Sequence, residues 1–276
     1  MARARNPLVG KTVVVTGAAS GIGRALALRL SRAGSPVAIA DFNAEGLAET
    51  ETMIDGPVLA QVVDVSDRAT MLGFAASVSE WSSAPIGAVI NNAGVTTSQS
   101  FLDASPEDDE WVMKINFGGV VNGSHAFMPL LLEQDSGTLV NVSSVFGLFG
   151  FPNQSAYCAS KHAVRGFTEA LRHELRGTGV SVAVVHPGGV KTNIVRNARF
   201  HADDKGNTDH GEAAERFASL ARATPEKAAG IIQAGIERGK PRIRIGGDAV
   251  LMDLLVRAAP VRYYDVMDRF IKLADR

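Results

Sequence analysis

Short runs of β-branched residues alternate along this chain with longer segments in which apolar residues recur at helical spacing. We expect strands at 12–16, 37–40, 58–63, 88–91, 138–142, 180–185 and 242–245, and helices at 22–33, 67–81, 106–134, 156–176 and 225–238. Strands that are connected through helices pair in parallel. The alternation therefore predicts an α/β fold with one doubly wound parallel sheet of about seven strands and helices on both faces.

The chain shows no linker, so residues 1–247 are expected to form a single domain. Within it, 193–224 is too long for an ordinary connection and is predicted to be a lid over the substrate. Residues 248–276 are expected to form an amphipathic helical tail. Because the positive and negative charges of the tail cancel, docking on the core or on a sister subunit is favoured over a membrane surface.

Composition excludes several classes of partner. The 276 residues carry 28 Lys and Arg against 29 Asp and Glu, a formal net charge of −1, which favours neither nucleic acid nor an anionic membrane. The single cysteine, Cys158, allows no intrachain disulfide. Without a signal peptide or a long apolar run, a cytoplasmic protein with a small-molecule partner is expected.

A glycine-rich turn follows the first expected strand and opens the next helix. It contains Gly17, Gly21 and Gly23, with Ser20 and Ile22 between them. Glycines let the backbone approach a pyrophosphate closely, and the N-terminus of the helix offers free N–H groups to it. The spacing differs from the usual Gly-x-Gly-x-x-Gly pattern, but the strand before and the helix after favour a Rossmann-type dinucleotide site over a simple turn.

Asp41 ends the second expected strand. A carboxylate at this place accepts the hydroxyls of an adenosine ribose and repels a 2′-phosphate, which favours NAD over NADP. Neither Ser20 nor Phe42 supplies the cation that a 2′-phosphate would need. The alternative is that Asp41 caps the helix that begins near Asn43.

Tyr157 and Lys161 are four residues apart on one expected helix and therefore lie on the same face. A neighbouring ammonium group favours the phenolate, so we expect the pKa of Tyr157 to be lowered and its side chain to act as a general acid and base. Such a pair also arises by chance. Cys158 points away from this face, has no evident base and is interpreted as a packing residue.

Two further polar positions stand close to expected structural breaks. Ser143 and Ser144 follow the strand 138–142, where a hydroxyl would meet a bound ligand, although serines also simply form turns. Asn116, followed by Gly118 and Gly119, interrupts the helix 106–134 and predicts a kink. The histidines show no metal-ligand spacing, so we expect no metal site.

In order, these motifs resemble the short-chain dehydrogenase/reductase family over residues 11–245. The resemblance includes Asp64 and Val65, the run Asn91-Asn92-Ala93-Gly94, and the segment from His186 to Thr192. Ser144, Tyr157 and Lys161 have the family's spacing of 13 and 4 residues.

The resemblance implies a role for each matching residue. Tyr157 would transfer the proton, Lys161 would lower its pKa and hold the nicotinamide ribose, Ser144 would bind the carbonyl oxygen, and Asn116 would hold a water of a proton relay. The residues implied to contact the cofactor are Gly17, Ser20, Gly21, Ile22, Gly23, Asp41, Asp64, Val65, Asn91, Ala93, Gly94, Tyr157, Lys161, Pro187, Gly188, Val190 and Thr192.

Together these observations predict an oxidoreductase that transfers a hydride between NAD and an apolar secondary alcohol or ketone. The alternatives are an NADP-linked 3-oxoacyl thioester reductase and a nucleotide-sensing protein without turnover. The residues 145–152, with three phenylalanines, are expected to line the substrate pocket, although some of these rings could simply pack in the core. The family resemblance also implies a homo-oligomer, a dimer or a tetramer.

Overall fold

The structure is a computed structural model that describes residues 8–202 and 208–265. The basic N-terminus, the polar cluster at 203–207 in the expected lid and the last part of the expected helical tail lie outside the described residues. No helix in the described part of the chain is long and apolar enough to cross a membrane.

The main sheet has seven strands, all parallel, which confirms the predicted fold class. In spatial order the strands are β3 (Val58–Val62), β2 (Val37–Asp41), β1 (Thr12–Thr16), β4 (Ile86–Asn91), β6 (Thr138–Val142), β7 (Ser181–Pro187) and β9 (Arg242–Ile245). The order reverses between β1 and β4, and ligands of open α/β sheets bind at such a reversal, beyond the carboxyl ends of the strands.

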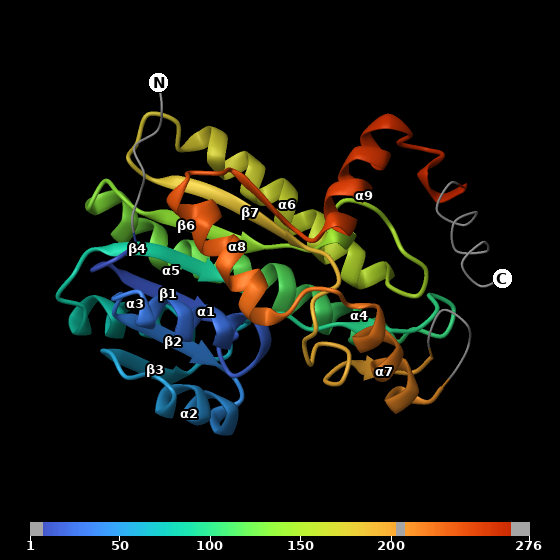
Figure 1. The fold of residues 1–276 in the computed structure, drawn as a ribbon, viewed down its shortest axis with the longest axis horizontal. Coiled ribbons are helices and arrows are strands. Elements are labelled where there is room, and N and C mark those ends of the chain that lie inside the picture. Colours follow the sequence, from blue (N-terminus) through green and yellow to red (C-terminus); the bar gives the residue numbers. More distant parts are fainter. Residues whose placement is uncertain (1–7, 203–207, 266–276) are drawn as a thin grey trace.

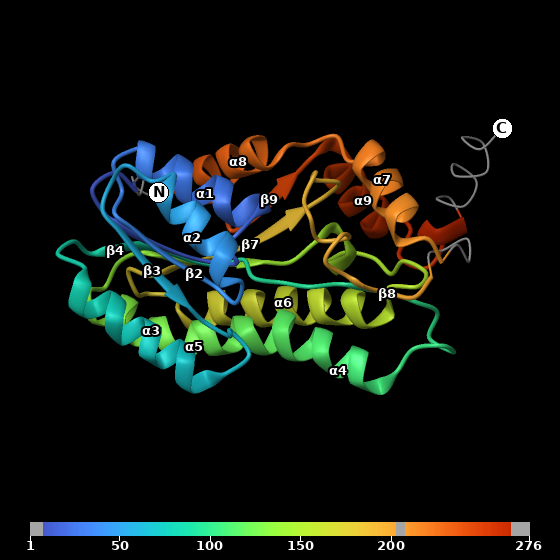
Figure 2. The same cartoon turned by 90° about the horizontal axis from the view of Figure 1, so that it is seen from below.

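Helices cover both faces of the sheet (Figure 2). One face carries α1 (Gly21–Arg32), α2 (Ala44–Thr52) and α8 (Pro225–Glu237), and the other carries α3 (Arg68–Trp81), α5 (Gly119–Glu133) and α6 (Ser155–Glu174). Each face has its own apolar core, one centred on α1 and α8 and the other on α3 and α5. Because both faces of the sheet are covered, its central strands are buried on both sides. This burial agrees with the near-continuous apolar sequences of β1 and β4.

The expected helix 106–134 is interrupted at the predicted place. It consists of α4 (Pro106–Met113), a π-helical turn (Lys114–Gly118) and α5. The turn contains Asn116, which is fully buried. Such turns insert one extra residue into a helix and are frequent at functional sites.

Short elements gather beyond the carboxyl ends of the strands (Figure 1). They include a two-stranded parallel ribbon of β5 (Thr97–Ser98) and β8 (Arg199–Phe200), the lid helix α7 (His210–Leu220) and a 3₁₀ turn (Val145–Gly147). The sequence analysis did not predict β5 and β8, because two residues are too few to show an alternating pattern.

The C-terminal tail begins with α9 (Gly247–Ala258), which is attached to β9 through a buried charged group. Asp253 is buried, whereas Leu251 and Leu254, two of the apolar residues behind the amphipathic pattern, are 65% and 57% exposed. The carboxylate of Asp253 accepts hydrogen bonds from the guanidinium groups of Arg242, Arg244 and Arg257. Three cationic partners compensate the cost of burying the carboxylate and hold its pKa below the usual value.

The packing of α5 on the sheet can be tested with two glycines. A Cβ atom at Gly123 would lie 2.1 Å from Oδ1 of the buried Asn91, whereas a Cβ at Gly73 in α3 would meet nothing within 4 Å. We expect Gly123→Ala to lower the free energy of unfolding by about 1–3 kcal/mol through overpacking. The control, Gly73→Ala, should raise it by about 0.5–1 kcal/mol because alanine favours the helix.

Urea denaturation without added cofactor measures both changes. A Gly123→Ala variant as stable as the parent would show that α5 does not press against β4 as the structure indicates.

Candidate active site

The glycine-rich turn has the geometry of a cradle for an anionic group. Gly17 and Gly21 have φ values of 70° and 55°, in the left-handed region that favours glycine. A Cβ at Gly23 would lie 2.0 Å from the carbonyl oxygen of Gly17, so no larger residue fits there. The N-cap of helix α1 is Ser20, whose side chain makes no capping bond, and the first turn has no acidic residue. Its first N–H groups are therefore suited to receive a phosphate.

The loop after β4 lies directly beside this turn. Thr16 Oγ1 accepts hydrogen bonds from the backbone N–H groups of Asn92 and Ala93 at 3.0 and 3.1 Å. In return, Nδ2 of Asn92 donates to the carbonyl oxygens of Thr16 and Gly17. These bonds tie the two loops together where the strand order reverses, at the sheet edge where ligands of open α/β folds bind.

Asp41 supports the turn from the end of β2. Its Oδ2 accepts from the backbone N–H of Ala19 and its Oδ1 from that of Asn43, both at 2.9 Å. The N-cap of α2 is Asn43, whose side chain accepts from Gly46. The structure thus assigns the capping role, the alternative considered for Asp41, to Asn43. Each carboxylate oxygen of Asp41 retains a lone pair for a ribose hydroxyl.

The other predicted adenosine-side residues serve the structure as well. Asp64 Oδ1 accepts from the N–H of Ser66, and the carbonyl oxygen of the buried Val65 accepts from Asn122 of α5. The Asn91 side chain lies between β6 and α5, because its Nδ2 donates to Asn141 and a Cβ at Gly123 would lie 2.1 Å from its Oδ1.

Tyr157 lies in the first turn of α6 and is 8% exposed. Burial raises the pKa of its phenol to about 12, and a hydrogen bond with Ser144 opposes that rise only in part. The sequence predicted a lowered pKa from the neighbouring ammonium group, and in this respect it was wrong. Desolvation of the phenolate is the dominant cause of the rise, although Nζ of Lys161 lies only 5.6 Å from the centre of the ring.

Lys161 is 3% exposed, and burial lowers its pKa to about 8. Its Nζ donates to the carbonyl oxygen of Val142 at the end of β6. A Cβ at Gly94 would lie 3.2 Å from this Nζ and 3.1 Å from Oδ1 of Asn116. Gly94, Lys161 and Asn116 therefore meet at one point, where a side chain at position 94 would press on the other two.

Asn116 joins the π-helical turn to its surroundings. Its Oδ1 accepts from the N–H of Val95, and its Nδ2 donates to the carbonyl of Val95 and to the hydroxyl of Ser160. Because both amide hydrogens already have acceptors, the side chain holds the loop after β4 against α6. A water of the implied relay would have to bond to the remaining lone pair of Oδ1 or to backbone atoms of the π-helical turn.

The two serines after β6 have different surroundings. The hydroxyl of Ser143 donates to the carbonyl of Lys161, which makes it a structural group. Ser144 Oγ accepts from the N–H of Phe146 and also shares the hydrogen bond with Tyr157. The carbonyl of Ser144 accepts from Nδ1 of His186. Burial lowers the pKa of this histidine to about 4, so at neutral pH it acts as a neutral donor.

The segment after β7 contacts β9, α9 and the glycine-rich turn. The N–H of Gly188 donates to Ile245, and that of Gly189 donates to Oδ2 of Asp248 in α9. Val190 is buried and forms a bridge to Ala223 at the end of the lid. A Cβ at Gly21 would lie 3.2 Å from Cγ2 of Thr192, so this segment reaches across to the glycine-rich turn.

An apolar cluster surrounds the phenol. The ring of Phe146 meets that of Tyr157 edge-on, with 6.1 Å between the centroids, and stacks on Phe151 at 5.0 Å. The cluster consists of Val95, Trp111, Val112, Phe146, Ala156, Tyr157 and Ile194. It draws on the loop after β4, on α4 and α6, on residues 145–152 (the substrate loop), which are expected to line the substrate pocket, and on the expected lid. A substrate carbon beside Tyr157 would lie against apolar side chains.

Several residues near the site escaped the sequence analysis. Asp108 of α4 is buried and binds Arg199 and His201 at 2.7 and 2.9 Å, which fastens the lid. Gln99 is also buried, and its side-chain amide has no hydrogen-bond partner among the described residues. Tyr263 of the tail reaches the substrate loop. No motif marks these residues, because each acquires its role through contacts distant in the sequence.

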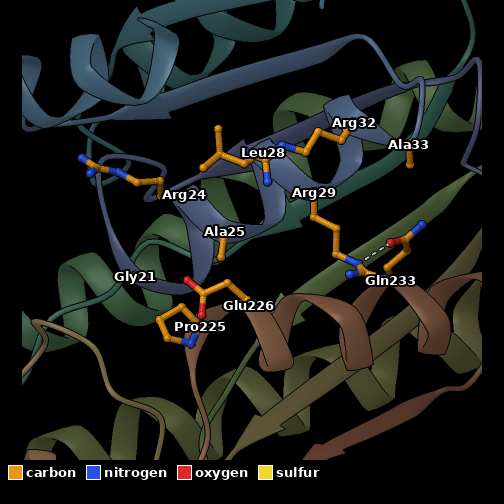
Figure 3. Close-up of a pocket in the computed structure, with 10 residues that line it drawn as sticks. All are labelled: Gly21, Arg24, Ala25, Leu28, Arg29, Arg32, Ala33, Pro225, Glu226 and Gln233. Carbon is orange, nitrogen blue, oxygen red and sulfur yellow. Dashed lines mark hydrogen bonds between the residues drawn. The ribbon is translucent and has the colours of Figure 1, made fainter. Parts of the chain in front are cut away.

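A separate groove lies on the outer side of α1, between this helix and α8 (Figure 3). Its lining includes Gly21 and three arginines of α1, and Arg29 donates across it to Gln233 at 2.7 Å. Ser144, Tyr157 and Lys161 do not line it. We therefore place the candidate active site at the carboxyl edge of the sheet, where these three residues come together.

The sheet topology and the glycine-rich turn at the reversal of strand order are those of a dinucleotide-binding fold. Residues 11–203 match the family model of the short chain dehydrogenases. The putative oxidoreductase SadH of Mycobacterium tuberculosis is 41% identical over 254 residues, which cover 90% of each chain. A short chain dehydrogenase/reductase from Burkholderia phymatum in complex with NAD is 30% identical with a TM-score of 0.82, covering 91% of this chain and 94% of that chain.

A second solved structure, the closed form of serine dehydrogenase complexed with NADP+, is 28% identical with a TM-score of 0.75 and covers 85% of this chain and 93% of that chain. This chain belongs to the short-chain dehydrogenase/reductase family, a family of oxidoreductases that bind a nicotinamide dinucleotide.

The buried ammonium group of Lys161 should cost the protein stability. At pH 7 the lysine is charged in the folded and in the unfolded chain, and its lowered pKa reports the price of desolvating that charge. We expect Lys161→Met, which keeps the length of the side chain, to raise the free energy of unfolding at neutral pH by about 1–3 kcal/mol.

The gain should fade as the pH rises from about 8, the pKa in the folded protein, toward the unfolded value of about 10.4. In that window the parent protein becomes more stable, because its folded state releases the proton first. Urea denaturation without cofactor at the two ends of the window measures this difference. A variant less stable than the parent at neutral pH would contradict the assigned desolvation.

Proposed function

We propose that this protein is an NAD-dependent dehydrogenase or reductase that interconverts an apolar secondary alcohol and its ketone. The observation that carries the proposal is the hydrogen bond between Ser144 and Tyr157 inside an apolar cluster, with Lys161 one helical turn away. In this arrangement a proton donor and a second hydroxyl both face the place where a substrate oxygen would lie.

Tyr157 would act as the general acid in the direction of reduction. With its pKa raised to about 12 the phenol is protonated at neutral pH and able to give its proton to the carbonyl oxygen. Ser144 would hold that oxygen. Oxidation requires the phenolate instead, so its rate should rise with pH. The nicotinamide, when bound, supplies or accepts the hydride.

Lys161 would take part in both proton transfer and cofactor binding. Among the described residues its one hydrogen bond is to Val142, which leaves N–H donors of the ammonium group for a ribose hydroxyl. The pyrophosphate would rest on the backbone of Gly17, Ser20, Gly21, Ile22 and Gly23 at the start of α1. Asp64, Val65, Asn91, Ala93 and Gly94 would contact the adenosine and ribose, and Pro187, Gly188, Val190 and Thr192 the nicotinamide.

The preference for NAD rests on Asp41. Its carboxylate stands beside the glycine-rich turn, and a 2′-phosphate there would meet a negative charge. Phe42 is 76% exposed and offers no compensating cation. Arg24 also lies at this turn, but its guanidinium is bound to Thr50, Glu49 and backbone carbonyl groups. Arg24 is therefore occupied by the structure of α1 and α2.

The substrate class follows from the apolar cluster. Phe146, Trp111 and Ile194 would bury alkyl or ring carbons, each CH₂ contributing about 0.8 kcal/mol, whereas the hydroxyls of a sugar would lose their hydrogen bonds. We extend the proposal to a homo-oligomer in the cytoplasm, as the family resemblance implies.

Turnover of a panel of secondary alcohols and polyols tests the proposal, with NAD reduction followed by its absorbance. We expect kcat/KM to rise with the apolar size of the substrate. Tyr157→Phe keeps the ring and its contact with Phe146 but removes the acid, so it should reduce kcat at least about 100-fold while NAD affinity and Tm stay close to those of the parent. A preference for polyols, or a Tyr157→Phe variant that retains most of the rate, would refute the proposal.

The cofactor preference has its own test. Asp41→Ala combined with Phe42→Arg removes a repulsion and adds a phosphate partner, so we expect the ratio of kcat/KM for NADP to that for NAD to rise at least about tenfold. The ratio is the appropriate readout, because loss of the Ala19 hydrogen bond should weaken both cofactors. Phe42→Arg alone is the control and should shift the ratio less. Equal use of NAD and NADP by the unmodified protein would overturn the assignment.

A further inference from the structure

A series of aromatic rings connects Tyr157 with the C-terminal tail. Phe146 meets Tyr157 at a centroid distance of 6.1 Å, Phe149 meets Phe146 at 5.4 Å, and Tyr263 meets Phe149 at 6.1 Å, all edge-on. Three of these rings belong to the substrate loop or to α6, and the fourth lies about a hundred residues further along the chain. The tail is thus in contact with the loop that borders the reacting phenol.

Tyr263 also holds the backbone of this loop. Its hydroxyl oxygen accepts the N–H of Gly150 at 3.1 Å. Gly150 follows the 3₁₀ turn and lies outside regular secondary structure. The phenol of Tyr263 therefore gives a backbone N–H of the loop an acceptor from another part of the chain.

Tyr263 is connected to the main sheet through α9. Its own N–H donates to Ala259, which directly follows α9. Helix α9 is fixed to β9 through Asp253 and its arginines and to the segment after β7 through Asp248. Both attachments lead back to the main sheet, so the position of Tyr263 relative to Tyr157 is set by the fold.

We propose that the described part of the C-terminal tail, residues 247–265, forms one wall of the substrate site and that Tyr263 determines specificity by positioning the substrate loop. By holding Phe149 and Gly150, Tyr263 keeps Phe146 in place beside Tyr157. A substrate that extends past Phe146 would meet this wall, whereas a small substrate would not reach it. This inference rests on the proposed function, because it concerns the substrate of the same site.

Two substitutions separate the contributions of Tyr263. Tyr263→Phe keeps the ring and removes the acceptor for Gly150, and Tyr263→Ala removes both contacts. For the bulkiest ketones of the panel we expect KM to rise about two- to tenfold in Tyr263→Phe, the equivalent of one hydrogen bond, and further in Tyr263→Ala. For the smallest ketones KM should stay within about twofold of the parent, and kcat and NAD affinity should hardly change.

Tyr264 provides a matched control, because it is the next residue and is 44% exposed. Tyr264→Phe and Tyr264→Ala should leave every KM unchanged. If the Tyr263 and Tyr264 variants behave alike, the proposal is overturned. An equal loss toward small and large substrates together with a lower Tm would also overturn it, since that pattern indicates a purely structural residue.

Hydrogen exchange gives a readout that does not depend on turnover. In Tyr263→Phe the amides of residues 145–152 should exchange faster, while those of the main sheet stay protected. Unchanged exchange in the loop would overturn the proposal. If the unmodified protein turned over no substrate while the loop still exchanged faster in Tyr263→Phe, the proposed function would fail and the positioning of the loop by Tyr263 would stand.

Discussion

The parallel direction of all seven strands is the constraint on which the site depends. In such a sheet every strand ends at the same edge, so the loops after β1, β4, β6 and β7 have to meet there. Two layers of helices bury the sheet and leave this edge as the place where polar groups collect. The hydroxyl of Thr16 shows the result, because it accepts from two N–H groups of a loop that follows another strand.

At this edge, burial shifts the pKa values of neighbouring acidic and basic groups in opposite directions. It raises the pKa of the Tyr157 phenol and lowers those of Lys161 and His186, because in each case the charged form loses its water. All three shifts favour neutral side chains. A neutral phenol in an apolar cluster keeps its proton until an acceptor is present. The lysine beside it loses its proton more easily than an exposed lysine, so its charge can change when the charge of its surroundings changes.

The spacing of residues along the sequence was sufficient to predict most of the fold and the polar residues at the centre of the site. Strands and helices repeat with periods of two and 3.6 residues, and the glycine-rich turn and the Tyr157–Lys161 pair lie within single elements. Burial depends instead on the assembled molecule. For this reason the sequence misjudged the direction of the pKa shift of Tyr157, and it could not distinguish the buried Asp253 from the other charges of the tail.

The π-helical turn also fixes how far α5 is rotated about its axis relative to α4. Asp108 on α4 must face the lid, while Gly123 on α5 must face Asn91 in the sheet. Each residue of a helix turns it by roughly 100°, so one residue more or fewer between these positions would point one of the two faces away from its partner. The length of this junction is therefore constrained, and a one-residue deletion there would turn Asp108 away from Arg199 and His201 or Gly123 away from Asn91.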